Sequence, residues 1–260
     1  MFDWTTASAE DVDHQYSPSR HAKRPLDEYL REYAERSAPF DPARTVVPGR
    51  PLLIYIHGGY WQRLSAADSL FNAPDAERLG FSLHAVEYSL APVASVEQII
   101  EECIHDIERV LAIARAPRVV IAGCSAGGHL AAMSAMSQRL DGKVDSVAIL
   151  SGVFDVRPVV RTPTNDPLGL DMRRATAISP QLKEISTFPP SAVVAVGRHE
   201  SDEFIRQSRE FAEKIARFGT RTVFGVVENR DHFDLPYDLL RTGTFVGDHV
   251  ISVLQGKEPQ

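Results

Sequence analysis

Cysteine is scarce in this chain of 260 residues, which contains only Cys103 and Cys124. Two cysteines cannot build a disulfide framework or a four-cysteine zinc site. No apolar run approaches the ~18 residues that a membrane-spanning helix needs. The first residues, Met1-Phe2-Asp3-Trp4, lack the basic and apolar segments of a signal peptide. These absences favour a soluble, cytoplasmic protein with no membrane partner.

Positive charge is in deficit, because 28 lysines and arginines face 35 aspartates and glutamates, for a net charge of −7. This balance argues against a partner made of nucleic acid or an anionic membrane surface. The apolar fraction of 43% and the charged fraction of 24% are those of an ordinary globular protein. Glycine-rich nucleotide-binding loops and the H-E-x-x-H zinc motif do not occur, which disfavours dehydrogenases, NTPases and metalloproteases. We expect no metal site and no cofactor.

From Pro51 onward, short apolar runs alternate with helical stretches. Such alternation is typical of an α/β fold with a mostly parallel central sheet and helices on both faces. We expect strands at 52–56, 82–88, 118–122, 146–150, 192–196 and 222–227, and helices near 65–79, 95–115, 126–140, 202–218 and 236–254.

Two segments fall outside this alternation. Residues 1–50 are polar and punctuated by proline, and they contain one apolar periodicity that predicts a short helix over 25–36. We expect this N-terminal arm to be an appendage to the core. Residues 154–190 are rich in proline and predict a cap-like insertion over one end of the sheet. The whole chain, 1–260, is therefore predicted to be a single domain.

A nucleophile candidate follows the third apolar run. Gly123-Cys124-Ser125-Ala126-Gly127 has the form G-x-S-x-G and lies between a predicted strand and an alanine-rich predicted helix. A strand that turns abruptly into a helix strains its middle residue and exposes that side chain. The N–H group of Ala126 then points into the same space and can stabilise an oxyanion. Cys124 is expected to be a packing residue that points away from the site.

A second motif follows the first apolar run, which ends in His57-Gly58-Gly59-Tyr60-Trp61. Two glycines after a strand let the backbone approach a ligand and aim N–H groups at it. We therefore expect Gly58 and Gly59 to complete the oxyanion hole, with His57 fixing the loop. Tyr60 and Trp61 are either core aromatics or a wall that faces the substrate.

A serine hydroxyl needs a base, and the base needs a carboxylate that orients it. His232 follows the last apolar run by a short polar loop, which is where the base is expected. Glu200 lies three residues after Gly197, on the loop that follows the fifth run, and is our candidate for the acid. Asp202 is the alternative, although acidic residues in a first helical turn are commonly explained by the helix dipole.

Together these motifs resemble the arylformamidase (kynurenine formamidase) branch of the α/β-hydrolases. Tyr16-Ser-Pro-Ser19 in the arm resembles the same branch, and Glu87-Tyr-Ser-Leu-Ala-Pro92 resembles a segment of hormone-sensitive-lipase-like esterases. The motifs that carry the resemblance are His57-Gly-Gly-Tyr-Trp-Gln62, Gly123-Cys-Ser-Ala-Gly-Gly-His129, Gly197-Arg-His-Glu-Ser-Asp-Glu-Phe204 and Asp231-His-Phe233.

The resemblance implies hydrolysis of N-formyl-L-kynurenine to formate and L-kynurenine, with Ser125 as nucleophile, His232 as base and Glu200 in the place of the acid. That acid is often Asp in the family, so Asp202 stays open. A carboxylesterase, or an amidase or carbamate hydrolase for other small aryl esters or amides, would use the same residues and also stays open. The partner implied is a small-molecule aryl amide or ester, and the sequence leaves a homodimer open.

Overall fold

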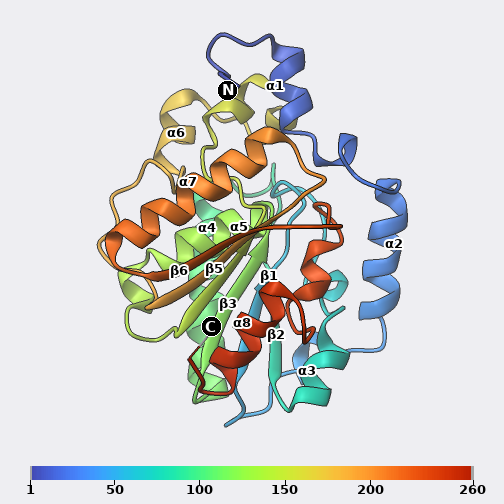
Figure 1. Ribbon diagram of the computed structural model, residues 1–260, viewed down its shortest axis with the longest axis vertical. Coiled ribbons are helices and arrows are strands. Elements are labelled where there is room, and N and C mark those ends of the chain that lie inside the picture. Colours follow the sequence, from blue (N-terminus) through green and yellow to red (C-terminus); the bar gives the residue numbers. More distant parts are fainter. Residues whose placement is uncertain (1, 259–260) are drawn as a thin grey trace.

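The computed structural model describes residues 2–258, so the extreme ends of the predicted 1–260 domain, residues 1, 259 and 260, lie outside the described residues. Residues 2–258 form a six-stranded sheet in the order β2-β1-β3-β4-β5-β6, and all neighbouring strands are parallel (Figure 1). The strands are β1 (Leu52–Ile56), β2 (Ser82–Val86), β3 (Val119–Cys124), β4 (Ser146–Leu150), β5 (Ser191–Gly197) and β6 (Arg221–Val227).

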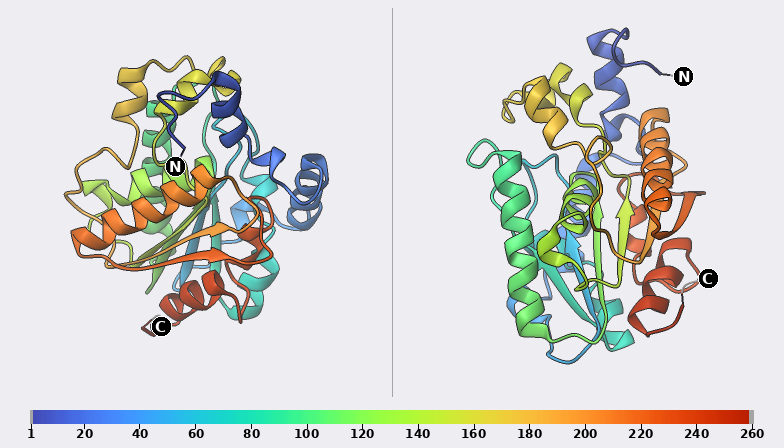
Figure 2. Two further views of the ribbon diagram at one scale, coloured as in Figure 1. Left: turned by 45° about the horizontal axis from the view of Figure 1, so that its top comes forward. Right: turned by 90° about the vertical axis from the view of Figure 1, so that its left-hand side faces the viewer.

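Helices cover both faces of this sheet, because the strands alternate their side chains between two apolar layers. Leu52, Ile54 and Ile56 pack with the helices α4 (Val96–Ala114), α5 (Ala126–Ala135) and α7 (Asp202–Phe218). Leu53 and Tyr55 pack with α3 (Ala73–Leu79) and α8 (Phe245–Leu254) on the other face. The view along the sheet shows α4 and α8 on opposite sides (Figure 2). The other helices are α1 (Ala9–Gln15), α2 (Leu26–Ser37) and α6 (Met172–Ala177).

Three predicted helices are shorter than expected, and the one near 126–140 ends with α5 at Ala135. The stretch 65–79 is helical in α3 only from Ala73, where Pro74 occupies the first turn and lacks the N–H that an interior position requires. The stretch 236–254 divides into a short 3₁₀ turn and α8, because Gly243 has a φ of 79° and Thr244 caps a new helix. None of these changes alters the order of the elements.

The arm and the cap-like insertion meet above the carboxyl ends of the strands. Helices α1 and α2 of the arm run along one side of the molecule, and α6 of the insertion lies at the same end as α1 (Figure 1). Ligands of parallel α/β sheets bind at this end. The cavity described below lies at this end of the sheet, and residues between 16 and 33 of the arm line it.

Candidate active site

Ser125 occupies the sharp turn between β3 and α5. Its φ of 59° and ψ of −123° lie in a region that L residues rarely adopt. A Cβ on Gly123 would come within 2.1 Å of the Gly127 carbonyl oxygen, and a Cβ on Gly127 within 2.0 Å of the Ile56 carbonyl oxygen. Glycine is therefore required at both positions for this turn to close, and the turn presents the Ser125 side chain to the cavity.

The loop after β1 lies directly against this serine. A Cβ on Gly58 would be 3.2 Å from the Cβ of Ser125, and Gly59 has a φ of 96°. The backbone N–H groups of Gly58, Gly59 and Ala126 find no backbone acceptor outside their own helices and strands within residues 2–258. Three N–H donors without such a backbone acceptor are thus available on Ala126, which follows Ser125, and on the loop that packs against it.

The His57 side chain stabilises that loop through a hydrogen bond and a ring contact. Its Nδ1 donates to the Gly58 carbonyl oxygen at 3.0 Å, and its ring stacks on Tyr88 with centroids 4.1 Å apart. Burial lowers the pKa of His57 to about 4, so the ring is neutral at pH 7. His57 thereby has a structural environment, as the sequence suggested, and the Tyr88 hydroxyl donates to its backbone carbonyl at 2.8 Å.

His232 and Glu200 are in direct contact. His232 Nδ1 donates to Glu200 Oε2 at 2.7 Å, and both side chains are buried. The other oxygen of Glu200 accepts from the Ser151 hydroxyl at 2.6 Å and from the Gly197 N–H at 2.7 Å. Asp202, the alternative acid, is exposed at the first position of α7 and makes no such contact.

The loop that carries His232 is tied to the arm through Asp231. This fully buried carboxylate accepts from the Tyr29 hydroxyl at 2.5 Å and from the Lys23 N–H at 2.8 Å. Burial acts to raise the pKa of Asp231, but these hydrogen bonds and those from the N–H groups of Phe233 and Asp234 outweigh it and lower that pKa. The residue before the candidate base is therefore an ionised anchor for the N-terminal arm.

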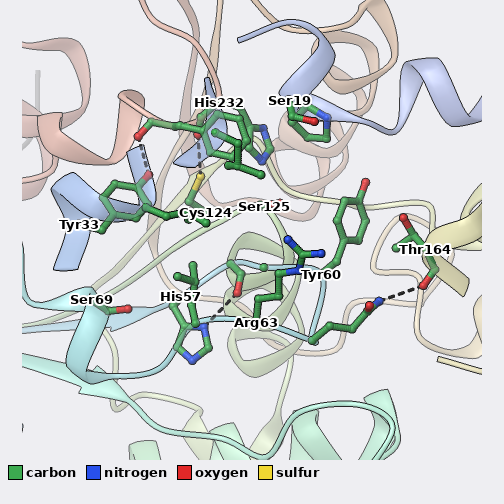
Figure 3. A pocket seen from close by; sticks show the side chains of 18 of the residues that line it. Ser19, Tyr33, His57, Tyr60, Arg63, Ser69, Cys124, Ser125, Thr164 and His232 are labelled. Atoms are coloured by element: carbon green, nitrogen blue, oxygen red, sulfur yellow. Dashed lines mark hydrogen bonds between the residues drawn. The ribbon is translucent and has the colours of Figure 1, made fainter. Parts of the chain in front are cut away.

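A cavity of about 230 Å³ joins these groups (Figure 3). Ser125 and His232 both line it, although no hydrogen bond joins the two side chains in the described part of the chain. Such contacts are often long without substrate. The other residues that line the cavity are Tyr16, Ser17, Pro18, Ser19, Leu26, Leu30, Tyr33, Tyr55, His57, Gly58, Gly59, Tyr60, Gln62, Arg63, Leu64, Ser69, Phe71, Cys124, Thr164 and Phe233.

The two aromatics of the glycine loop differ in position. Tyr60 lines the cavity, and its hydroxyl donates to the Tyr16 carbonyl oxygen at 2.6 Å. Trp61 is fully buried, lies outside the cavity lining, and packs edge-on against His129 with ring centroids 5.0 Å apart. The prediction of a substrate-facing Trp61 is wrong, because successive φ angles of 51° and 60° at these residues turn the indole into the core.

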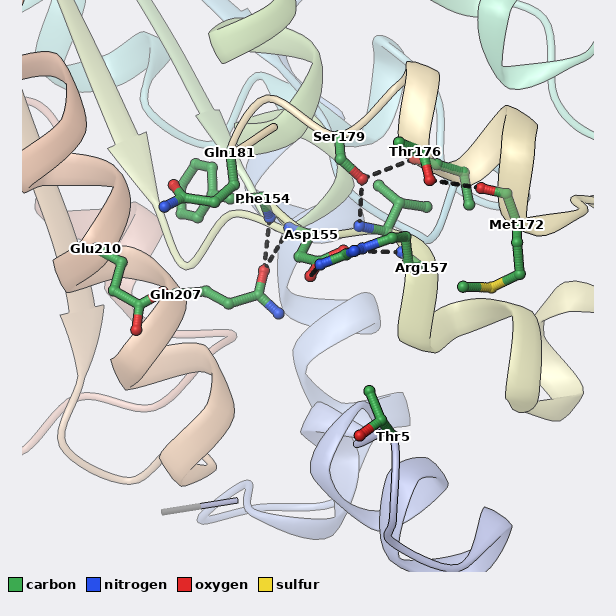
Figure 4. A network of polar contacts seen from close by, with 12 residues as sticks. Thr5, Phe154, Asp155, Arg157, Met172, Thr176, Ser179, Gln181, Gln207 and Glu210 are labelled. Carbon is green, nitrogen blue, oxygen red and sulfur yellow. Dashed lines mark hydrogen bonds and ion pairs between the residues drawn. The ribbon is translucent and has the colours of Figure 1, made fainter. Parts of the chain in front are cut away.

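The arm was expected to be an appendage, but it forms one wall of the cavity. Seven of its residues, from Tyr16 to Tyr33, line the cavity, and the Tyr16 hydroxyl reaches α7 and donates to Glu203 at 3.0 Å. Gln207, one turn further along α7, accepts from the N–H groups of Phe154 and Asp155 at 2.8 and 2.7 Å (Figure 4). Helix α7 thus joins the arm to the cap-like segment.

The remaining candidates have structural surroundings, although Cys124, which was expected to point away from the site, is among the residues that line the cavity. His129 donates from Nε2 to the Ile178 carbonyl oxygen at 2.7 Å, and His249 contacts the Ser146 hydroxyl at 3.1 Å. Burial lowers the pKa of each ring to about 4. Cys124 is buried with its Sγ 3.5 Å from the His232 carbonyl oxygen, and burial raises the pKa of its thiol, so the thiolate needed for nucleophilic attack is disfavoured.

Sequence reasoning missed two kinds of residue. Ser151 orients Glu200 from the end of β4 with a φ of 48°, and no local signal marks it. The arm residues carried a signal in Tyr16-Ser-Pro-Ser19, whose place in the cavity wall required the structure. Within residues 2–258, no group of three His, Cys, Asp or Glu side chains is placed to hold a metal ion, and no helix there is long and apolar enough to cross a membrane.

Comparisons with known proteins agree on one family. A family model described as an alpha/beta hydrolase fold matches residues 53–174. Kynurenine formamidase of Danio rerio is 29% identical over 272 residues, covering 90% of this chain and 92% of that protein. Kynurenine formamidase of Salmo salar is 31% identical over 196 residues, covering 71% and 66%.

Solved structures share the architecture. An esterase of Pyrobaculum calidifontis superposes with a TM-score of 0.71 at 17% identity, covering 98% of this chain and 95% of that one. A thermostable carboxylesterase from a metagenomic library superposes with a TM-score of 0.68 at 18% identity, covering 98% and 99%. At these identities the likeness establishes the fold alone, which is that of the α/β-hydrolases.

Proposed function

Because the chain belongs to the arylformamidase-like α/β-hydrolases, we propose that it is a serine hydrolase that cleaves the formamide bond of N-formyl-L-kynurenine, giving formate and L-kynurenine. The observation that carries this proposal is the buried His232–Glu200 hydrogen bond of 2.7 Å beside a cavity that Ser125 also lines. Similarity to kynurenine formamidases along most of the chain supports the choice of substrate.

In this proposal Ser125 is the nucleophile and His232 the general base. Donation from Nδ1 to Glu200 leaves Nε2 of the neutral imidazole with the lone pair that takes the serine proton. Glu200 stabilises the imidazolium that forms, and its second oxygen is already held by Ser151 and Gly197. The acid therefore cannot rotate without losing two further hydrogen bonds.

The reaction proceeds in two acyl transfers. Ser125 attacks the formyl carbon, and the N–H groups of Gly58 or Gly59 and of Ala126 stabilise the oxyanion. His232 then protonates the leaving aryl amine, so that the carbon–nitrogen bond breaks and a formyl-serine ester remains. Water repeats the attack with His232 as base, releasing formate and restoring the serine.

Contacts with the leaving aryl amine decide which substrate is preferred, because a formyl group needs almost no pocket. Tyr60 from the glycine loop and Phe233 beside the candidate base line the cavity and present ring surfaces to an aromatic amine. Leu26, Leu30 and Tyr33 of the arm extend the same apolar wall. The proposed aryl site therefore includes the N-terminal segment.

A side-by-side assay on the purified protein tests the proposal. N-formyl-L-kynurenine and short p-nitrophenyl esters are compared by kcat/KM, with kynurenine and p-nitrophenol followed by absorbance. We expect the formamide to be preferred by at least about tenfold, which is ~1.4 kcal/mol in transition-state free energy. Turnover of the esters with none of the formamide would instead establish the carboxylesterase alternative.

We also propose that the protein acts in the cytoplasm. Cys103 and Cys124 are free, buried thiols, as is usual in reducing compartments. The homodimer that the sequence leaves open stays a prediction, which light scattering coupled to gel filtration would test.

A further inference from the structure

Arg63 is the one arginine or lysine among the cavity-lining residues of the described chain, and no aspartate or glutamate lines the cavity beside it. Its guanidinium points into the cavity in Figure 3. The side chain is exposed, and within residues 2–258 no carboxylate lies within ion-pair distance of it. A positive charge without a partner carboxylate among the described residues thus lines the same cavity as the candidate nucleophile Ser125.

The backbone around Arg63 is fixed even though its side chain is free. A Cβ on Gly59 would come within 2.4 Å of the Arg63 carbonyl oxygen, and the Gln62 N–H donates to the Gly59 carbonyl at 3.0 Å. The Gln62 side chain also donates to the Thr164 carbonyl oxygen at 2.9 Å, which ties this turn to the cap-like segment. The guanidinium therefore extends from a rigid turn that is continuous with the proposed oxyanion loop.

A guanidinium binds a carboxylate through two parallel hydrogen bonds, and it has no acceptor for an ammonium group. An amino-acid side arm brings one carboxylate and one ammonium into the cavity. The lining offers the first a cation and the second no anion. The charge of the cavity lining is therefore complementary to the carboxylate of such a substrate and not to its ammonium group.

We infer that Arg63 binds the carboxylate of the substrate, and that the enzyme selects aryl formamides by this carboxylate while the α-amino group is dispensable. The inference rests on the proposed function and specifies its substrate class as anionic aryl formamides. A charged hydrogen bond of this kind corresponds to about a 10- to 100-fold preference.

Three formamides and three variants test this. The substrates are N-formyl-L-kynurenine, its desamino analogue 4-(2-formamidophenyl)-4-oxobutanoate, and neutral 2′-formamidoacetophenone. The variants are Arg63→Gln, Arg63→Lys and, as the matched control, Arg173→Gln, which removes an exposed arginine of α6 outside the cavity. Fluorophosphonate labelling counts functional active sites, so a misfolded variant is recognised.

We expect wild type to prefer both carboxylates over the neutral formamide about 10- to 100-fold in kcat/KM, through KM. Arg63→Gln should abolish that ratio, Arg63→Lys should restore part of it, and Arg173→Gln should leave it unchanged. An unchanged ratio in Arg63→Gln would overturn the inference. If the kcat/KM of the desamino analogue is as low as that of the neutral formamide, the enzyme recognises the ammonium group instead. That result would also overturn the inference.

An ester pair separates this result from failure of the proposed function. If wild type hydrolyses no formamide, the proposed function fails, and Arg63 is then judged on mono-p-nitrophenyl succinate against p-nitrophenyl acetate. Preference for the anionic ester that disappears in Arg63→Gln would uphold carboxylate binding on its own. Equal loss of both esters would assign Arg63 a structural role.

Discussion

The cavity has a floor, formed by the loops after β1 and β3 with Gly58 and Ser125, and an arm wall, formed by residues between 16 and 33. These two sides are built by different means. On the floor, Ser125 and Gly58 are set by backbone closeness, with glycine positions where any Cβ would collide with a neighbouring carbonyl. On the arm wall, Tyr16 and Tyr29 are held by hydrogen bonds to carboxylates 187 and 202 positions away in the chain. The floor is thus encoded within short motifs, whereas the wall depends on partners that no short motif contains.

The largest expected effect belongs to the floor. Ser125→Ala should lower kcat by ~10⁴–10⁶ while the protein folds normally, because the members of a triad act as a unit. Alanine keeps the Cβ and therefore the backbone conformation at φ 59°. Steady-state kinetics and fluorophosphonate labelling measure the loss, and retention of more than a tenth of the wild-type rate would contradict the role of Ser125.

The second prediction separates the two acid candidates. Glu200→Gln should lower kcat by up to ~10⁴, because the amide cannot stabilise the His232 imidazolium. Asp202→Asn, the matched control two residues further along the chain in the first turn of α7, should leave kcat within a few-fold and cost only ~0.3–1 kcal/mol of unfolding free energy. Reversed rates in the two variants would move the acid to Asp202.

The third prediction tests whether the arm is fastened to the floor. Tyr29→Phe removes one hydrogen bond to Asp231 and should lower the unfolding free energy at pH 7 by about 1.5–3 kcal/mol. Urea denaturation of both proteins measures it, and equal midpoints would show that the arm is not anchored there.

The pH dependence of that difference has a definite sign. The pKa of Asp231 is lowered in the fold, with the Tyr29 hydroxyl among its causes, so the stabilisation is complete above the ordinary Asp pKa of ~3.9. It is lost as the pH falls through the lowered value. The gap between wild type and Tyr29→Phe should therefore shrink below about pH 4, and a gap that widens there would contradict the ionised state of Asp231.

The smallest effect concerns histidines buried outside the arm. His249 has a pKa of about 4 in the fold against ~6.5 in the unfolded chain, so the unfolded state binds more protons between these values. Stability should fall from pH 7 to pH 5, by about 1–2 kcal/mol for this residue. Denaturation curves of His249→Asn should show a weaker pH slope, while His105→Gln, an exposed site on α4, should keep the wild-type slope.

Sequence patterns predicted the sheet well because each strand is an apolar run. All six strands begin and end within two residues of the expected bounds for this reason, and the largest differences are at the end of β2, which stops at Val86, and at the end of β3, which continues to Cys124. The candidate triad residues Ser125, Glu200 and His232 were placed by the same logic, since each lies on the segment that follows a run. Their catalytic roles stay predictions that the variants above test.

What could not be predicted has a common physical cause. Trp61 is buried because two consecutive residues adopt positive φ, and side-chain chemistry alone does not reveal that conformation. Ser151 reaches Glu200 only because β4 and β5 are neighbours in the sheet. The arm wall likewise arises from tertiary contacts, such as that of Tyr16 with Glu203.

The backbone of Ser125 has a consequence for laboratory evolution. A conformation near φ 59° costs an L residue about 1–3 kcal/mol, and glycine adopts it without that cost. Selection for heat resistance alone would therefore favour glycine at position 125 and discard the nucleophile together with the strain. Directed evolution of a thermostable variant therefore requires that turnover be screened in every round, because one gain in melting temperature is available at the residue that carries the nucleophile.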